Sequence, residues 1–487
     1  MSSGLDAGDV AGAAAGRARQ RRDREGDAGL PLRSTGRHSH GPDRQGLHRR
    51  RDPGDRRLVR HTEVKSSRRE FLKLGVTVSV GAALFPARAS AQSTAARVVV
   101  VGGGFAGASC ARALRQADPR IVVTLVEPNP TFTACPFSNA VIVGLRELRA
   151  QQFTYERVAA DGIVISRTTA TGVDPQARSV TLADGTRLPY DRLVLAPGIE
   201  IRWNALPGYD QAAAAQMPHA WQAGEQTLLL RRQLEAMDDG GLVVISAPAN
   251  PFRCPPGPYE RASLIANFLK TKKPKSKLIV LDAKDAFSKQ RLFQQAWSEL
   301  YPGLLEWVPL SKGGSVTSVD PATRTLVTDF GRHQAKVANV IPPQKAGRLA
   351  DVAGVTDRTG WCPIDPATFE SKLQPGVHVI GDAAIAGAMP KSAFAANSQA
   401  KSCAAAIARL LTGATPSTPK LINTCYSLVA PDYGISVAGV YQPSGGQIAE
   451  VPGSGGVSPA DAPRATRAAE AVLAEAWFRT ITDEVFG

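Results

Sequence analysis

The chain has 487 residues, of which 43% are hydrophobic and 21% charged, with 58 lysines and arginines against 43 aspartates and glutamates. This length predicts two or three domains, and the composition is that of a globular protein, which excludes a fibre and a multi-span membrane protein. The formal net charge of +15 would suit nucleic-acid binding if it were spread over the folded part. Residues 1–91, however, contain 19 of the basic residues and only 10 of the acidic ones. The remainder is nearly balanced, and nucleic-acid binding is not expected.

The N-terminal region has two parts. Residues 1–65 are rich in Gly, Ala and Arg and lack an apolar run, which predicts disorder. Residues 66–91 contain an Arg pair, then an apolar run, then small residues, which is the order of a twin-arginine export signal. The apolar run, Leu74 to Phe85, has 12 residues, short of the ~20 that a membrane span requires.

These features predict a periplasmic protein that is exported in the folded state, without a membrane span, with a mature chain that starts near Gln92. Because export signals normally stand at the extreme N-terminus, we also expect translation to begin near Val64, with residues 1–63 not translated.

A nucleotide-binding motif follows the signal. The β-branched run 97–101 predicts a strand buried on both faces, a helix is expected over 108–116, and 121–126 predicts a second strand ending at Glu127. Between the first strand and the helix lie three glycines at G-x-G-x-x-G spacing: Gly102, Gly104 and Gly107. This context predicts a dinucleotide site, with the pyrophosphate at the helix N-terminus and the adenosine ribose at Glu127.

Two later segments indicate which dinucleotide is bound. Residues 190–198 form a strand-like run into a small-residue turn, and residues 376–383 form another that ends in Gly381-Asp382. With the glycine motif, in this order, they resemble the flavoprotein superfamily with two dinucleotide domains, which implies FAD and gives Asp382 a role at the ribityl and pyrophosphate groups. The helix-like segment from Lys391 would then direct its N-terminus at the isoalloxazine.

The corresponding second motif, for a nicotinamide, is missing. Residues 241–251 have the strand but not the glycines, and Pro248 and Pro251 remove backbone donors that a phosphate needs. A further strand over 277–281 indicates that the domain itself is intact. We therefore expect the electron partner to be a quinone, a protein or dioxygen rather than a nicotinamide.

The expected fold class is α/β, with two Rossmann-like dinucleotide-binding domains of the FAD/NAD(P)-linked reductase type and a C-terminal α+β domain. The predicted segments are the FAD-binding domain (92–205 and 331–415), the second domain without a nucleotide fingerprint (206–330) and a C-terminal domain that covers the flavin (416–487).

The six cysteines all lie after the export signal. Cys110 and Cys403 fall in Ala-rich helical patterns, where a thiol usually packs as a small hydrophobe. No C-x-x-C, zinc spacing or C-x-x-C-H occurs, so we expect no metal and no covalent haem on this chain. Residues 252–261 contain three prolines and a glycine around Cys254, which predicts a stiff loop whose arginines lower the thiol pKa.

From Arg97 to Gly487 the chain resembles the flavoprotein subunit of flavocytochrome c sulfide dehydrogenase, a family related to sulfide:quinone oxidoreductases. The resemblance lies in motifs spread over this whole range: Val98–Gly107, Thr133–Asn139, Pro218–Trp221, Phe252–Arg261, Gly360–Pro363, His378–Asp382, Met389–Ser392, Asn423–Ser427 and Val485–Gly487.

The resemblance implies a role for each of three cysteines. It places Cys135 at the position that is bonded covalently to the flavin. It also implies a redox disulfide beside the flavin between Cys254 and Cys425, with Cys362 as the alternative partner of Cys254.

Two further residues acquire possible roles near the flavin. Glu260 is a candidate local acid or base, although a loop salt bridge with Arg261 is an equal alternative. Trp477 corresponds to an aromatic residue of the family near the flavin, where it would otherwise be interpreted as packing.

The implied reaction is oxidation of hydrosulfide to sulfur or polysulfide, with electrons passing through the disulfide and FAD to a c-type cytochrome subunit. A sulfide:quinone oxidoreductase is the nearest alternative, but the tail 464–487 has few large apolar residues, which argues against membrane docking. A flavin-bearing accessory protein of a sulfur-oxidation complex is the other alternative.

Overall fold

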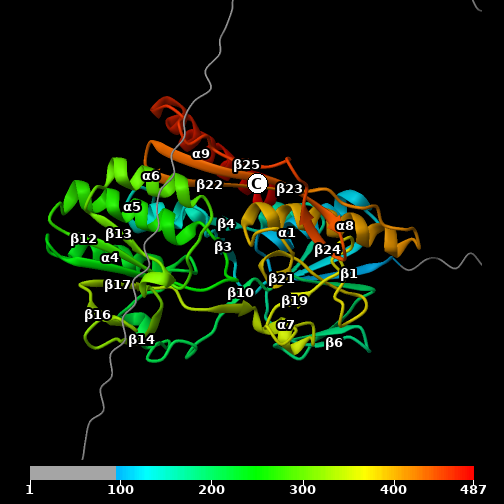
Figure 1. Ribbon diagram of the computed structural model, residues 1–487. Coiled ribbons are helices and arrows are strands. Elements are labelled where there is room, and N and C mark those ends of the chain that lie inside the picture. Colours follow the sequence, from blue (N-terminus) through cyan, green and yellow to red (C-terminus); the bar gives the residue numbers. More distant parts are fainter. Residues whose placement is uncertain (1–94) are drawn as a thin grey trace, which may run out of the picture. The chain divides into compact units, whose positions relative to one another are not determined.

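A five-stranded parallel sheet is the centre of the first domain in the computed structural model, which describes residues 95–487 (Figure 1). Its strand order is β20-β9-β1-β2-β5, and each neighbouring pair is parallel. The strands are β1 Arg97–Val101, β2 Val122–Val126, β5 Val164–Ser166, β9 Arg192–Leu195 and β20 Val377–Val379. The valines of β1 are buried, as the β-branched run predicts. The expectations for residues 1–91 lie outside the described part of the chain.

Two long helices pack side by side in this domain: α1 Phe105–Ala117 and α8 Ala393–Leu411. The Asn397 side-chain amide on α8 donates a hydrogen bond to Ser109 Oγ on α1 at 3.0 Å. Cys110 and Cys403 are fully buried in these helices, as expected for packing thiols. Helix α1 begins inside the glycine motif rather than at Ala108, because the last glycine forms part of its first turn.

The second domain is inserted between β9 and β20. Its parallel sheet has the order β13-β12-β11-β17, and three helices accompany it. The elements are α4 Glu225–Ala236, β11 Leu242–Ala247, α5 Gly257–Lys272, β12 Lys277–Asp282, α6 Gln290–Leu300, β13 Leu305–Val308 and β17 Val337–Val340. Because β17 pairs with β11, the domain ends after Val340, and the boundary predicted at residue 330 is too early.

The segment around Cys254 is only partly a loop. Helix α5 begins at Gly257, so the second half of the predicted stiff loop is helical. Pro258 is tolerated there because the first N–H groups of a helix have no intrahelical acceptor. Cys254 lies in the turn just before the helix, with a left-handed φ of 56°.

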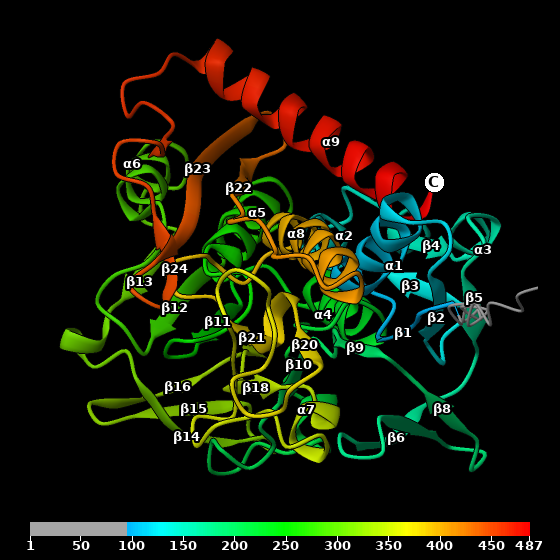
Figure 2. The same ribbon diagram turned by 90° about the vertical axis from the view of Figure 1, so that its right-hand side faces the viewer.

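A C-terminal layer extends over both domains (Figure 2). It consists of an antiparallel sheet and one long helix: β22 Leu421–Ala430, β23 Tyr433–Ser444, β24 Gln447–Glu450, β25 Gly456–Val457 and α9 Arg464–Phe486. The Tyr301 hydroxyl of the second domain donates to the Val429 carbonyl at 2.6 Å, and Arg112 of the first domain donates to the Glu484 carbonyl at 2.7 Å. These contacts hold the layer to both domains.

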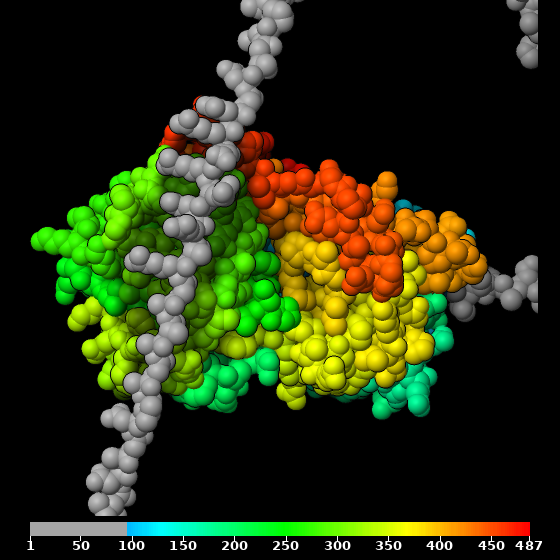
Figure 3. Space-filling view, viewed as in Figure 1, coloured from blue at the N-terminus to red at the C-terminus, as the bar shows by residue number. Residues whose placement is uncertain are grey.

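Short elements complete the architecture. They are mostly edge ribbons and single turns: β3 Thr131–Thr133, α2 Ser138–Ile142, η1 Leu148–Gln151, β4 Gln152–Thr154, α3 Glu156–Ala160, β6 Ala170–Asp174, β7 Ser179–Leu182, β8 Arg187–Pro189, β10 Ile199–Ile201, η2 Ala213–Ala215, η3 Leu310–Lys312, β14 Val316–Asp320, β15 Thr325–Thr328, β16 Gly331–Gln334, β18 Gln344–Ala346, α7 Arg348–Val352, β19 Cys362–Pro363, η4 Gly381–Ala383 and β21 Ala384–Ile385. In the space-filling view, the green second domain meets the yellow and orange segments along one seam (Figure 3).

Within residues 95–487, no helix is both long and apolar enough to cross a membrane.

Candidate active site

A cavity with about 1350 Å³ of empty space, including its opening to solvent, is lined by residues of the first domain, the second domain and the C-terminal layer. Most of the site residues expected from the sequence line it: Gly104, Cys135, Cys254, Glu260, Gly381, Asp382, Cys425 and Trp477. The other four do not line it: Gly102, Gly107, Glu127 and Lys391.

The glycine loop owes its shape to close backbone packing. A Cβ atom on Gly107 would lie 1.8 Å from the Gly102 carbonyl oxygen, and one on Gly102 would lie 2.3 Å from the Ala196 carbonyl oxygen. Gly104 differs, because a Cβ atom there would meet only the Phe132 ring, at 3.4 Å. Gly102 and Gly107 therefore form the turn, while Gly104 faces the cavity at the N-terminus of α1.

Glu127 supports this loop from behind. Its Oε2 accepts a hydrogen bond from the Gly103 N–H at 2.8 Å, and its Oε1 accepts one from the Asn129 N–H at 2.9 Å. The Tyr155 hydroxyl donates to the Gly103 carbonyl at 3.0 Å. Glu127 stands at the end of β2, as predicted, and its contact with a ribose stays a prediction.

The Gly381-Asp382 turn packs against the first turn of α1, next to the glycine loop. Gly381 has a φ of +74°, and a Cβ atom on it would lie 2.9 Å from the Ala106 Cβ atom of α1. Burial raises the pKa of Asp382. The Lys391 ammonium donates to the carbonyls of Asp382 at 2.7 Å and Ala384 at 2.8 Å, so its side chain stabilises the turn instead of reaching the cavity.

The N-terminus of α8 faces the cavity, as expected for the segment after Lys391. Ser392 caps the helix by accepting a hydrogen bond from the Ala395 N–H at 3.0 Å, and it lines the cavity together with Phe394. The positive ends of α1 and α8 both point at this space, which favours an anionic group there.

Three cysteines from three parts of the chain line the cavity: Cys135, Cys254 and Cys425. All the cysteines are free thiols in the structure. Cys362 is fully buried outside the cavity lining, and burial raises its pKa to about 12. Of the two expected partners of Cys254, only Cys425 lines the same cavity, and the pairing itself stays a prediction.

The thiol of Cys254 does not have the environment expected from its neighbours in sequence. Burial raises its pKa, and the charges of Glu260 and Cys425 raise it further, whereas Arg253 and Lys289 act in the opposite direction. The predicted lowering is wrong, because desolvation outweighs the two nearby cations.

Glu260 lies on α5, half-buried against β22. Its Oε1 accepts from the Leu428 N–H at 2.9 Å, and its Oε2 accepts from Asn139 Nδ2 at 3.1 Å. Burial raises its pKa. The alternative of a salt bridge with Arg261 is wrong, because that guanidinium instead donates to the side-chain oxygens of Asn139 at 3.0 Å and Asn339 at 2.9 Å.

Two buried cations lie near the cysteines, although the sequence did not predict either as a site residue: Arg261 and Lys289, which are 2% and 7% exposed. The Arg261 guanidinium stacks over the Trp221 ring at 5.0 Å and donates to the Ala220 carbonyl at 2.6 Å. Arg261 lies in a recognised motif, so its position could have drawn attention. Lys289 lies in no motif, and only its three-dimensional surroundings reveal it.

The residues present fit FAD. The indole N–H groups of Trp221 and Trp477 are buried without a hydrogen-bond partner, and both rings line the cavity. These two unpartnered donors suit the polar ring system of a cofactor. The two helix N-termini and the glycine loop, with open space before Gly104, suit its anionic part. Gly104, Asp382 and the N-terminus of α8 would hold it.

The second domain has no comparable nucleotide site. At the end of β12, where a dinucleotide domain places its ribose-binding carboxylate, Asp282 is fully buried. Its carboxylate accepts from the Tyr259 hydroxyl at 2.6 Å, the Lys284 ammonium at 2.6 Å and Trp307 Nε1 at 2.9 Å. Phe287 stacks on Tyr259 with ring centroids 3.5 Å apart. These contacts engage the Asp282 carboxylate within the domain, and the absence of a nicotinamide stays a prediction.

Fold and site together define a flavoprotein oxidoreductase with two dinucleotide-type domains, of which the first retains the cofactor cavity. Three family models match the chain: pyridine nucleotide-disulphide oxidoreductase over residues 96–236, the central part of the sulfide dehydrogenase [flavocytochrome c] flavoprotein chain over 227–342, and the flavin-binding part of flavocytochrome c sulphide dehydrogenase over 417–486. The chain belongs to the family of the flavoprotein chain of flavocytochrome c sulfide dehydrogenase.

Individual relatives agree with this family. The sulfide dehydrogenase [flavocytochrome c] flavoprotein chain of Chlorobaculum thiosulfatiphilum is 71% identical over 45 residues, which are 9% of this chain and 94% of that sequence. The mitochondrial sulfide:quinone oxidoreductase of Mus musculus is 23% identical over 324 residues, 64% of this chain and 71% of that protein. The solved structure of the Aquifex aeolicus sulfide:quinone oxidoreductase is similar in fold, with a TM-score of 0.63 at 17% identity, covering 80% of this chain and 92% of that one.

Proposed function

We propose that this protein oxidises hydrosulfide through FAD and a redox pair formed by Cys254 and Cys425, and that it passes the electrons to a c-type cytochrome. The observation that carries the proposal is that both thiols line one cavity with the glycine loop and the N-termini of α1 and α8. Family membership supports sulfide as the substrate.

The reaction follows thiol–disulfide exchange. Hydrosulfide attacks the Cys254–Cys425 disulfide, so that its sulfur bonds to one cysteine as a persulfide while the other cysteine leaves as a thiolate. Release of zero-valent sulfur from hydrosulfide frees one proton and two electrons. Bound FAD supplies a two-electron acceptor that can return the electrons singly.

The surrounding residues assist this chemistry. Glu260 is half-buried, its pKa is raised by desolvation, and it serves as the local store for the released proton. The helix N-termini of α1 and α8 favour the extra negative charge that reduction brings into the cavity. Cys135 lines the same space and is the proposed site of covalent flavin attachment.

The electron acceptor is proposed to be a cytochrome in the periplasm, reached after twin-arginine export of the folded chain. A quinone is the second candidate, favoured by the likeness to sulfide:quinone oxidoreductases and by Val472 and Leu473, which are exposed on α9. An assay of the purified protein with sulfide and either cytochrome c or a soluble quinone separates them. Rapid reduction of quinone alone would overturn the cytochrome proposal.

Anaerobic addition of sulfide tests the chemistry itself. The flavin absorbance of the wild type should bleach, and Cys254→Ser and Cys425→Ser should each abolish the bleaching. Cys362→Ala is the matched control, because this thiol lies outside the cavity lining, and it should bleach normally. No bleaching of the wild type would favour an accessory flavoprotein.

A further inference from the structure

Lys289 occupies an unusual position for a lysine. It stands at the N-cap of α6 with a left-handed φ of 61°, and its side chain is 7% exposed. A left-handed backbone is unfavourable for a residue with a Cβ atom, a cation at a helix N-terminus opposes the dipole, and burial of an ammonium is costly. Local rules that are broken together at one residue point to a role in the site.

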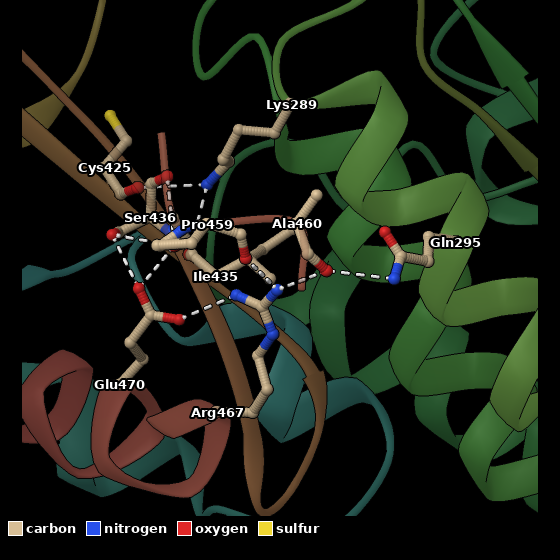
Figure 4. A network of polar contacts seen from close by, with 10 residues as sticks. Lys289, Gln295, Cys425, Ile435, Ser436, Pro459, Ala460, Arg467 and Glu470 are labelled. Atoms are coloured by element: carbon tan, nitrogen blue, oxygen red, sulfur yellow. Dashed lines mark hydrogen bonds and ion pairs between the residues drawn. The ribbon is translucent and has the colours of Figure 1, made fainter. Parts of the chain in front are cut away.

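The Lys289 ammonium is held by neutral groups of the C-terminal sheet (Figure 4). It donates to the Cys425 carbonyl at 3.0 Å, to Ser427 Oγ at 2.8 Å and to the Ile435 carbonyl at 3.5 Å. Three acceptors match the three donors of a protonated lysine. None of them is a carboxylate, so the charge is not neutralised by its direct partners.

The ionisable groups that act on the Lys289 ammonium come from four segments around it. They are Glu260 of α5, Cys254 of the preceding turn, Cys425 of β22 and Glu470 of α9, and each favours the charged lysine, whereas burial lowers its pKa. Glu470 is already engaged, because Arg467 Nη1 donates to its Oε2 at 3.2 Å and Ser436 Oγ donates to its Oε1 at 2.9 Å (Figure 4).

Glu260 is also occupied by two N–H donors, so the other acidic groups near the ammonium are the thiols of Cys254 and Cys425. The ammonium binds the backbone of Cys425 directly. On the cavity side, Cys425 Sγ contacts the Asn423 side chain at 3.5 Å, and Tyr441 of β23 is the other titratable group nearby. The arrangement places a buried ammonium against the backbone of one cysteine of the proposed redox pair.

We propose that Lys289 is a positioning residue of the redox pair: its buried ammonium holds the β22 backbone at Cys425 and stabilises the thiolate of that residue. The inference rests on the proposed function for its purpose, since opening a disulfide with hydrosulfide leaves one cysteine as a thiolate. Lys289 does not line the cavity, so its charge would act through the protein.

The test measures alkylation of Cys425 as a function of pH in the reduced holoprotein, by a short pulse of iodoacetamide and quantification of the Cys425 peptide. Only the thiolate reacts, so the midpoint of the profile reports its stability. Because a nearby cation favours the thiolate, Lys289→Gln should move the midpoint upward by about one pH unit, a roughly tenfold lower thiolate fraction at neutral pH.

A second pair of variants leaves the lysine in place. Ser427→Asp puts a carboxylate against the ammonium and should produce a similar upward shift. Ser427→Asn introduces a side chain of the same shape as Asp but without charge, and it should keep the wild-type midpoint. Thermal unfolding of all three variants measures any loss of stability. A purely structural role of Lys289 would lower the unfolding temperature without moving the midpoint of the alkylation profile. Equal midpoints for Ser427→Asp and Ser427→Asn, or an unshifted Lys289→Gln, would overturn the proposal.

Alkylation of Cys425 needs no catalytic turnover, so the role of Lys289 and the proposed function can fail independently of each other. If the wild type does not oxidise sulfide but the Lys289 and Ser427 variants shift the Cys425 profile as expected, the role of Lys289 stands and the assigned substrate falls. If sulfide is oxidised and the profile does not shift, the reverse holds.

Discussion

Glu260 and Arg261 are consecutive and oppositely charged, one half-buried and the other buried, yet they make no ion pair with each other. The amide of Asn139 lies between them: its Nδ2 donates to Glu260 at 3.1 Å, and its Oδ1 accepts from Arg261 at 3.0 Å. Consecutive residues of a helix point in different directions, so a third residue has to connect them. Because Asn139 follows Cys135 closely in sequence, the segment that brings this thiol to the cavity also connects the two charged side chains.

Replacing the bridging amide should destabilise the fold. Asn139→Leu leaves Arg261 Nε without an acceptor and Glu260 Oε2 without its donor, so the free energy of unfolding should fall by about 2–4 kcal/mol. Urea unfolding followed by circular dichroism measures the loss. Asn267→Leu on α5 is the control, because the side chain of Asn267 is only partly buried and has no comparable bridge; equal losses in the two variants would contradict the role given to Asn139.

Two glycines of the first motif, Gly104 and Gly107, should respond differently to alanine. Gly104→Ala should fold with nearly normal stability but bind less flavin, because the new methyl group enters the cavity beside the Phe132 ring. Gly107→Ala should lower stability by roughly 3 kcal/mol or more, since its Cβ atom would collide with the Gly102 carbonyl. Flavin absorbance per chain and thermal unfolding distinguish the two effects. Normal flavin content in a folded Gly104→Ala would argue against a cofactor at this loop.

Covalent attachment has a direct test. If Cys135 bonds to the flavin, acid precipitation of the protein should leave the yellow colour in the pellet, and Cys135→Ala should release it into the supernatant. Cys362→Ala is the control and should keep the colour in the pellet, because Cys362 lies outside the cavity lining. A colourless wild-type pellet would show that the cofactor is held without a covalent bond.

Acid should weaken the fold partly through His219. Burial, together with the charges of Arg261 and Arg253, lowers its pKa from 6.5 to about 4. The folded state therefore binds fewer protons than the unfolded state between these values, so stability is present above pH 6.5 and is lost as the pH falls toward 4. The full effect of this shift amounts to roughly 3 kcal/mol.

His219→Asn should reduce this loss. The asparagine oxygen can accept the hydrogen bond that the backbone N–H of Trp221 now donates to His219 Nδ1 at 2.9 Å, but the asparagine does not titrate. Urea unfolding at pH 7 and pH 4.5 gives the difference for wild type and variant. His333→Asn, on the edge ribbon strand β16, is the control. An unchanged pH dependence in His219→Asn would show that the acid sensitivity arises elsewhere.

Local patterns were enough to predict the cofactor domain. The valine run of β1, the glycine motif and the Gly381-Asp382 turn each lie within a few residues, and their conformations follow from sterics and burial that neighbours along the chain determine. The family motifs around Cys254 and Cys425 are local in the same sense. The missing glycines at residues 241–251 likewise indicated a second domain without a nucleotide site.

The tertiary structure alone decided how these pieces act on one another. It brought Cys425 and not Cys362 to the cavity with Cys254. It also replaced the expected salt bridge of Glu260, reversed the expected pKa shift of Cys254 and bonded the Lys289 ammonium to the Cys425 carbonyl. Each of these depends on burial and on contacts between segments more than a hundred residues apart. Desolvation and long-range charge are properties of the packed interior, so the sequence determined which groups are present, and packing determined their ionisation and their partners.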